Sequence, residues 1–506
     1  MQQIKTSFIA GLSVLCLLCL TCSAGSETAA SESDASQILQ DLRAAIARNP
    51  ADLDAQSHLI RALLHENQLR DALDAAGKAD QQIPNNAAIK ALVGDVLYRL
   101  ANFDKAYSFY LAGIGCDAGC SRCFLGAGKV QQTAFRRKSA RNAFRKAYEL
   151  NPEDPDIIIA YATTQANDED KALLLEKFLR TAVDDPTKHL NSSRSSLDLH
   201  RKTAAKTTEL LSPLQPYSVK LNIMRHRSQT SDGMYIYASL NHTKPIKLQL
   251  DTGASGLLIK TRAANAAGLT PLSVSQALGI GDDGARATQI SLADHFKVGD
   301  LEIANLPVEF GEQAVPGDAD GLIGTDVFSR FLIHLNIREQ VMGLTPLPPY
   351  PDGDNDWQSH DRVVPDNSPS SVLARRIGHQ LLVPTLVNDQ SISYFLVDTG
   401  SSMNLIDEAY ARRFTSVGIT EMVKLEGISG GVKKLYSATH IRLQFGHFVQ
   451  EDNGMLALKL DDLNGVNGVQ VNGIIGWPTL SNLILSLNYR DGIVDFIHPS
   501  EAKKHK

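Results

Sequence analysis

Two copies of the tripeptide Asp-Thr-Gly are the part of this sequence best suited to chemistry. They begin at Asp251 and at Asp398, and each follows a short apolar run. Two carboxyl groups a few ångströms apart cannot both ionise, so they share one proton. Such a pair can take a proton from a water molecule and give one to a polar bond. Asp251 and Asp398 are therefore the candidate catalytic residues.

A wider repeat surrounds the two tripeptides. Gly-Leu-Ile-Gly at 321–324 is echoed by Gly-Ile-Ile-Gly at 473–476, and the same offset carries Leu335-Asn336 to Leu487-Asn488. From Tyr217 onward, short runs of β-branched and apolar residues alternate with Gly, Asn and Asp turns, which predicts β-strands. We expect two copies of one all-β lobe, 217–346 and 374–499, joined by a proline-rich linker at 347–373.

Both lobes resemble aspartic peptidases, on the strength of the two Asp-Thr-Gly tripeptides and of the apolar-apolar-Gly strands downstream of them. Each half is similar in length to a retropepsin unit, so the pair looks like a covalently joined retropepsin dimer. The resemblance covers roughly Tyr217 to Pro499. It implies an endopeptidase that activates a water between Asp251 and Asp398, acts on peptide or protein substrates, and needs no cofactor and no metal.

The residues around each aspartate suit this role. Glycine permits the sharp turn that leaves the carboxylate pointing into a cleft, and the family resemblance implies that the two threonines hydrogen-bond across a pseudo-twofold axis. The supporting residues are Thr252, Gly253, Thr399, Gly400 and Ser401.

The two copies differ at one informative position, where Ala254 in the first corresponds to Ser401 in the second. A hydroxyl donor favours the ionised form of a carboxyl group. We therefore expect Asp251 to hold the shared proton and the working pH range to lie closer to neutral than in a site with two such hydroxyls.

Glycine-rich segments follow the two aspartates at matching distances. Gly279 follows Asp251 at almost the same separation along the chain as Gly427 follows Asp398. Both segments formally match other motifs, a dinucleotide loop and a serine-hydrolase elbow, but without the helix that those motifs require. The family resemblance implies substrate flaps, and ordinary surface turns are the alternative. The flap candidates are Gly279, Gly281, Gly427 and Gly430, and neither tip carries the tyrosine typical of pepsins.

Another period precedes the β lobes. Small residues and prolines recur at intervals of 34 or 68 between 34 and 182, where apolar residues have helical spacing: Pro50, Pro84 and Pro152; Ala72, Ala106 and Ala140; Gly94 and Gly128. A 34-residue period is typical of helix–turn–helix units, and the segment 25–182 resembles a tetratricopeptide array with three clear repeats and a degenerate fourth from about Pro155. It either binds a protein partner or positions the lobes. The polar segment 183–216 is predicted to be a linker.

The segment 1–24 reads as an export signal. A basic residue, Lys5, precedes an apolar stretch from Phe8 to Leu20, and small residues follow. Cleavage after Ala24 is one interpretation and lipidation of Cys22 is the other, so we expect a periplasmic or extracellular protein, or a membrane-anchored lipoprotein. No other run reaches the ~20 apolar residues of a membrane span.

The three remaining cysteines do not make a complete metal site. Cys116, Cys120 and Cys123 form an incomplete zinc set, so we expect one local disulfide with one thiol left over and leave the pairing open.

A net charge of −6 over 506 residues gives no support to nucleic-acid binding. The segment 500–506 forms a polar tail. The alternatives to a peptidase are a non-catalytic peptide-binding scaffold and halves that each pair with another chain.

Overall fold

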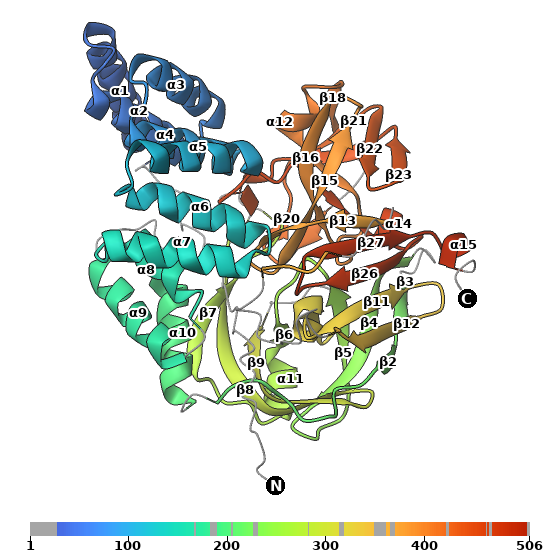
Figure 1. Cartoon of the computed structure of the whole chain (residues 1–506). Coiled ribbons are helices and arrows are strands. Elements are labelled where there is room, and N and C mark those ends of the chain that lie inside the picture. The colour runs from blue at the N-terminus through green and yellow to red at the C-terminus, as the bar shows by residue number, and fades with distance from the viewer. Residues whose placement is uncertain are drawn as a thin grey trace.

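The structure is a computed structural model that describes residues 28–165, 168–182, 190–203, 206–225, 231–281, 283–312, 318–348, 361–364, 370–420, 425–461, 463–464 and 468–502. The expected export signal, with Cys22, lies outside these residues, as does the end of the predicted tail from 503 onward. None of the helices in the described ranges is long and apolar enough to cross a membrane. Figure 1 shows a helical array beside two β lobes.

The array consists of a leading helix and four helix pairs, followed by α10. The first helices of the pairs begin at Leu53, Ala87, Ser121 and Pro155, so the 34-residue period is confirmed and extends to the fourth pair. The bounds are α1 (Thr28–Arg48), α2 (Leu53–His65), α3 (Leu69–Gln82), α4 (Ala87–Arg99), α5 (Phe103–Cys116), α6 (Ser121–Thr133), α7 (Arg137–Leu150), α8 (Pro155–Ala162), α9 (Asp168–Thr181) and α10 (Leu190–Lys202).

Small residues allow the helices of each pair to approach closely. A Cβ added at Gly94 would lie 2.5 Å from the Tyr110 ring, and one at Gly128 would lie 2.5 Å from the Phe144 ring. The three periodic alanines, Ala72, Ala106 and Ala140, are all buried. The periodic glycines and alanines therefore mark helix–helix contacts.

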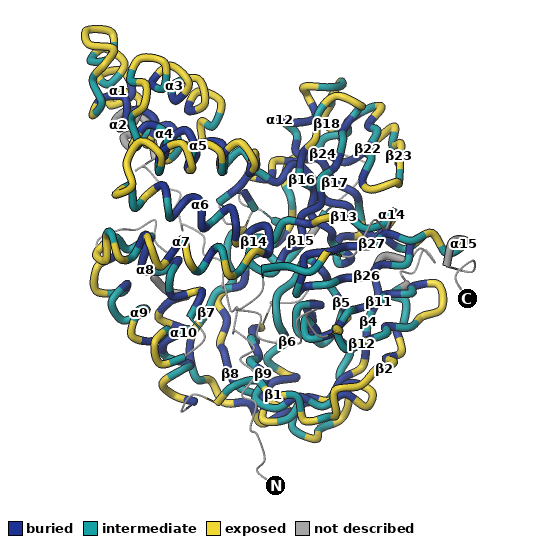
Figure 2. Tube along the Cα trace, in the orientation of Figure 1, coloured by how far each residue is buried: buried dark blue, intermediate teal, exposed yellow. Residues whose placement is uncertain are grey.

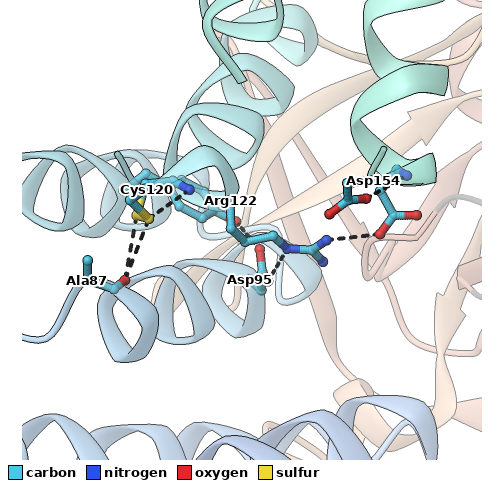
Figure 3. A network of polar contacts seen from close by, with 8 residues as sticks. Ala87, Asp95, Cys120, Arg122 and Asp154 are labelled. Atoms are coloured by element: carbon cyan, nitrogen blue, oxygen red, sulfur yellow. Dashed lines mark hydrogen bonds and ion pairs between the residues drawn. A yellow bond between two sulfur atoms is a disulfide. The ribbon is translucent and has the colours of Figure 1, made fainter. Parts of the chain in front are cut away.

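A polar network crosses three helix pairs (Figure 3). The Arg122 guanidinium on α6 contacts the Asp95 carboxylate of α4 at 3.3 Å and that of Asp156 on α8 at 2.9 Å. The Tyr110 hydroxyl donates to Asp95 at 2.8 Å. Beside this network Cys120 and Cys123 form a disulfide, and Cys116 is an exposed free thiol. The pairing that the sequence left open is thus Cys120 with Cys123.

Each lobe is built on its own sheet. The strands of the first lobe are β1 (Glu209–Leu210), β3 (Asn222–Arg225), β4 (Ser231–Leu240), β5 (Ile246–Asp251), β6 (Leu257–Lys260), β7 (Ser273–Ala277), β8 (Arg286–Val298), β9 (Leu301–Gly311) and β10 (Gly321–Gly324), with α11 (Thr261–Ala266) and the 3₁₀ helix η1 (Thr325–Phe328). Those of the second lobe are β14 (Arg375–Ile377), β15 (Gln380–Val387), β16 (Ser391–Val397), β17 (Leu405–Asp407), β18 (Val417–Thr420), β21 (Leu435–Ala438), β22 (Ile441–Phe445), β23 (Phe448–Asp452), β24 (Met455–Leu458) and β25 (Gly473–Ile475), with α12 (Glu408–Ala411), α14 (Trp477–Leu480) and the short hairpin of β19 (Glu426–Gly427) and β20 (Gly430–Gly431).

A third sheet joins the two lobes. Its strands run in the order β13 (Ser371–Leu373), β27 (Ile493–Ile497), β26 (Ile484–Asn488), β11 (Phe331–Asn336), β12 (Val341–Pro346) and β2 (Tyr217–Lys220). At its centre β11 and β26 pair antiparallel, with Ile333 opposite Leu487 and Leu335 opposite Leu485. These strands are the repeated copies of one another, so the pairing is symmetric. Buried residues concentrate in the strands where the lobes meet (Figure 2). The last helix of the described residues is α15 (Pro499–Ala502).

Both segments predicted to be linkers contain regular structure. The first holds α10 and β1, and the second holds β13, which pairs with β27. Helix α10 reads as polar because it is rich in serine, yet Ser193, Ser195, Leu197 and Leu199 are buried. The Ser195 hydroxyl donates to the backbone carbonyl of Val274 on β7. The composition of this segment therefore hid a helix that packs on the first lobe.

The array also packs on the second lobe. The Gln470 N–H donates to the Arg99 carbonyl at 2.7 Å, and the Phe103 ring meets the Tyr394 ring edge-on at 5.2 Å. The Arg375 guanidinium contacts the Asp104 carboxylate at 2.8 Å. The turn between the helices of the second pair is thus fixed to the lobe.

Candidate active site

Equivalent strands bring the two aspartates to the lobe interface. Asp251 ends β5 and pairs with Gly324 of the parallel strand β10. Asp398 follows β16, and its N–H donates to the Ile475 carbonyl of β25 at 3.0 Å. Glycine lets these neighbouring strands approach the aspartate loops: a Cβ added at Gly324 would lie 2.4 Å from the carbonyl oxygen of Ala254.

Thr252 and Thr399 bind each other's loops across the pseudo-twofold axis. The Thr252 N–H donates to Thr399 Oγ1 at 3.1 Å, and the Thr399 N–H donates to Thr252 Oγ1 at 2.9 Å. In turn Thr252 Oγ1 donates to the Val397 carbonyl at 2.7 Å, and Thr399 Oγ1 donates to the Leu250 carbonyl at 3.2 Å. Both threonines are completely buried. Because every bond has a counterpart in the other copy, the two loops are held in one symmetric arrangement.

The two carboxyl groups meet in this arrangement. The charge of Asp251 acts on Asp398, and each carboxylate accepts an N–H from its own loop, from Gly253 at 2.7 Å and from Gly400 at 2.9 Å. A Cβ added at Gly400 would lie 2.2 Å from an oxygen of Asp251, and one at Gly253 would lie 2.7 Å from the carboxyl carbon of Asp398. Only glycine fits at either position, and a single chain holds both aspartates in one site.

The assignment of the shared proton to Asp251 stays a prediction. Burial raises the pKa of Asp398 well above its usual range, and the charge of Asp251 and the hydrogen bond to it add to this rise. The Ser401 hydroxyl does not oppose this rise in pKa, because it donates to the Met403 carbonyl at 2.8 Å. Ser401 contacts Asp398 through its backbone N–H, at 3.1 Å. The raised pKa favours the protonated form of Asp398, and the proton belongs to the coupled pair of carboxyl groups.

The two glycine-rich segments touch each other above the aspartates. The Gly279 N–H donates to Ser429 Oγ at 3.1 Å, the Ser429 N–H donates to the Ile280 carbonyl at 3.1 Å, and the Asp283 N–H donates to the Ser429 carbonyl at 2.8 Å. Close approach needs glycine here, since a Cβ at Gly427 would lie 2.3 Å from the Ile280 carbonyl oxygen.

The other two flap candidates also lie at this contact. A Cβ at Gly281 would lie 2.3 Å from the Ser429 backbone, and one at Gly430 would lie 2.0 Å from an Asp283 carboxylate oxygen. Sequence reasoning missed Ser429, although its position between Ile428 and Gly430 in the glycine-rich segment was a usable signal.

A cavity of about 430 Å³ lies between the aspartates and these two tips. Asp251, Asp398, Gly279, Gly281 and Gly427 all line it. Its walls are largely apolar and come from both lobes: Leu258, Ile290, Leu322, Leu425, Val432 and Leu458. His379, which the sequence did not single out, also faces this cavity. Within the described ranges no three His, Cys, Asp or Glu side chains could together hold a metal ion.

One protein family model matches part of the chain. Residues 236–327, which include Asp251, match the model of the family described as aspartyl protease. No curated protein matches the sequence.

Among solved structures, the aspartic proteinase from Irpex lacteus is 11% identical, with 56% of this chain and 98% of that one covered and a TM-score of 0.37. Pseudomonas aeruginosa PilF is 20% identical, with 35% and 88% covered and a TM-score of 0.27. A TPR protein of Thermus thermophilus is 19% identical, with 33% and 93% covered and a TM-score of 0.29. Likenesses this slight do not bear on function.

Proposed function

We propose that this protein is an aspartic-type endopeptidase whose single active site is shared by the two lobes. The observation that carries the proposal is the symmetric pair of aspartate loops, whose two carboxyl groups line one cavity with two touching glycine-rich tips. Both lobes contribute a tip, in keeping with a joined retropepsin-like pair. The match of residues 236–327 to the aspartyl protease family supports the same chemistry.

The geometry suggests how the two carboxyl groups divide the work. Ionised Asp251 takes a proton from a water held between them, while protonated Asp398 donates its proton to the carbonyl oxygen of the scissile amide. The water oxygen forms a bond to the carbonyl carbon and gives a tetrahedral diol. Asp251 then returns its proton to the amide nitrogen, the C–N bond breaks, and Asp398 recovers the proton of the diol hydroxyl. The flap tips exclude bulk water meanwhile.

The cavity walls favour apolar side chains on both sides of the scissile bond. Leu258, Ile290 and Leu322 from the first lobe face Leu425, Val432 and Leu458 from the second. Burying such side chains against them contributes roughly 25 cal/mol per Å² of apolar surface. Export through the N-terminal segment, and a role of the array in binding a protein partner or in positioning the lobes, complete the proposal.

The test is cleavage of a mixed peptide library by the full chain, compared with Asp251→Asn and Asp398→Asn. We expect wild-type cleavage between apolar residues and loss of activity in both variants, with exposed Asp300→Asn as the matched control that retains activity. An inactive wild type that still binds library peptides would favour a non-catalytic scaffold. Residual activity in either variant would favour separate sites formed by two chains.

A further inference from the structure

His379 is a polar residue of the active-site cavity that the dyad chemistry leaves without a role. It lies in the turn between β14 and β15 of the second lobe, and the turn is fixed because the Arg376 Nε–H donates to the Gly378 carbonyl at 2.6 Å. The imidazole crosses the lobe interface, and its Nε2 lies 2.7 Å from the Gly253 carbonyl oxygen of the first lobe. A carbonyl only accepts, so Nε2 carries the proton in this contact.

The glycine that His379 contacts touches both carboxyl groups. The Gly253 N–H donates to Asp251, and the Gly253 Cα packs so closely on Asp398 that a Cβ would lie 2.7 Å from its carboxyl carbon. Glycine is the least restricted residue of the chain. A hydrogen bond that fixes its carbonyl therefore fixes the backbone that sets the spacing of the pair.

The second aspartate loop is held in another way. There the Ser401 hydroxyl donates to the Met403 carbonyl at 2.8 Å, and the Ser401 carbonyl accepts the Trp477 N–H at 2.8 Å. The first loop has Ala254 at the position of Ser401 and so lacks the hydroxyl. His379 binds a different carbonyl, that of Gly253, and does so from the opposite lobe.

The Nε2 contact to Gly253 is what holds the His379 imidazole in place. His379 Nδ1 is buried and has no hydrogen-bond partner among the described residues. An unpaired buried nitrogen costs free energy, so the bond from Nε2 to the Gly253 carbonyl is the contact that fixes the ring.

We propose that His379 is a positioning residue of the active site, which holds the Gly253 carbonyl and thereby the geometry of Asp251 and Asp398. This inference rests on the proposed peptidase function. It concerns the backbone beneath the carboxyl groups, and His379 takes no proton from substrate or water.

The experiment compares His379→Leu with His379→Gln, whose amide N–H can reach the same carbonyl, in the full chain. We expect kcat of the leucine variant to fall on the order of 10- to 100-fold with little change in KM, and the glutamine variant to recover most of the loss. His334→Leu is the matched control, because His334 also makes one short imidazole hydrogen bond, to Ser486 at 2.7 Å in the sheet that joins the lobes. It should keep its kcat.

A second measurement does not depend on activity. Titration of the Asp251 and Asp398 carboxyl ¹³C signals by NMR should change in His379→Leu and return toward wild type in His379→Gln. Unchanged kcat in the leucine variant, or equal loss in both variants, would overturn the inference. If the wild type cleaves no peptide, the peptidase proposal fails, and the titration decides alone: identical curves for wild type and His379→Leu would then refute the positioning role.

Discussion

At the scale of single residues, the site depends on an asymmetry within a symmetric frame. The threonines and glycines of the two loops make equivalent hydrogen bonds, but the pKa of Asp398 is raised by burial and by Asp251. The Ser401 hydroxyl does not act directly on Asp398, because it donates to the Met403 carbonyl. Burial is the stronger effect for a carboxyl group enclosed between two lobes.

The raised pKa of Asp398 makes the stability of the protein depend on pH. The folded chain binds this proton more tightly than the unfolded chain, so the stabilisation is full below the unfolded pKa of about 3.9 and is lost as the pH rises toward the raised value. Asp398→Asn stays neutral at every pH. The free energy of unfolding of this variant in urea, relative to that of the wild type, should therefore increase from about pH 4 upward. A difference that is the same at every pH would contradict this.

Ala254→Ser tests the role of the hydroxyl directly. By analogy with Ser401 and Met403, a hydroxyl at position 254 would donate to the backbone carbonyl of Gly256 and not to Asp251. The acidic limb of the pH–rate profile should therefore stay where it is in the wild type. A displaced limb would show that the new hydroxyl reaches the carboxylate and would restore the explanation based on sequence.

At the scale of elements, the two flap tips form one closed unit over the cavity. Ser429 binds both Gly279 and Ile280 of the opposite tip, so each flap fixes the other. If the proposed peptidase function holds, we expect these bonds to open for substrate entry and to close over the bound substrate.

Alanine at Gly427 should hinder this closure. Its Cβ would lie 2.3 Å from the Ile280 carbonyl oxygen, whereas a Cβ at Gly431 in the same hairpin meets nothing within 4 Å. We expect kcat/KM of Gly427→Ala to fall about tenfold or more and amide hydrogen exchange at the tips to speed up, with Gly431→Ala unchanged. Equal effects of the two substitutions would argue against a closed pair of flaps.

At the scale of the whole molecule, the array and the lobes form a continuous packed structure. Phe135, in the turn between α6 and α7, is 1% exposed and belongs to the core of the lobes, where a Cβ at Gly492 would lie 2.1 Å from its ring. Asp361, in the segment between the lobes, accepts from the Ser139 N–H at 2.9 Å and from its hydroxyl at 2.8 Å. The array is thus fixed both to the second lobe and to the connection between the lobes.

Removing the Phe135 ring should therefore destabilise the whole protein. Phe135→Ala creates a cavity between array and lobe and should lower the free energy of unfolding in urea by about 3 kcal/mol. Leu111→Ala, at a side chain that is 47% exposed on α5, should change it by no more than about 0.5 kcal/mol. Similar values for the two variants would mean that the array does not pack on the lobe in solution.

The sequence by itself determined the two periods and, through them, the elements. Repeated small residues such as Gly94 and Gly128 predicted the helix pairs, and apolar runs ending at Asp251 and Asp398 predicted the strands that place them, because these signals are local. Only the tertiary structure decided how far Asp398 is buried, that His379 crosses to Gly253, and where Phe135 is buried. Each of these depends on groups that are distant in sequence and on how completely the fold removes them from water.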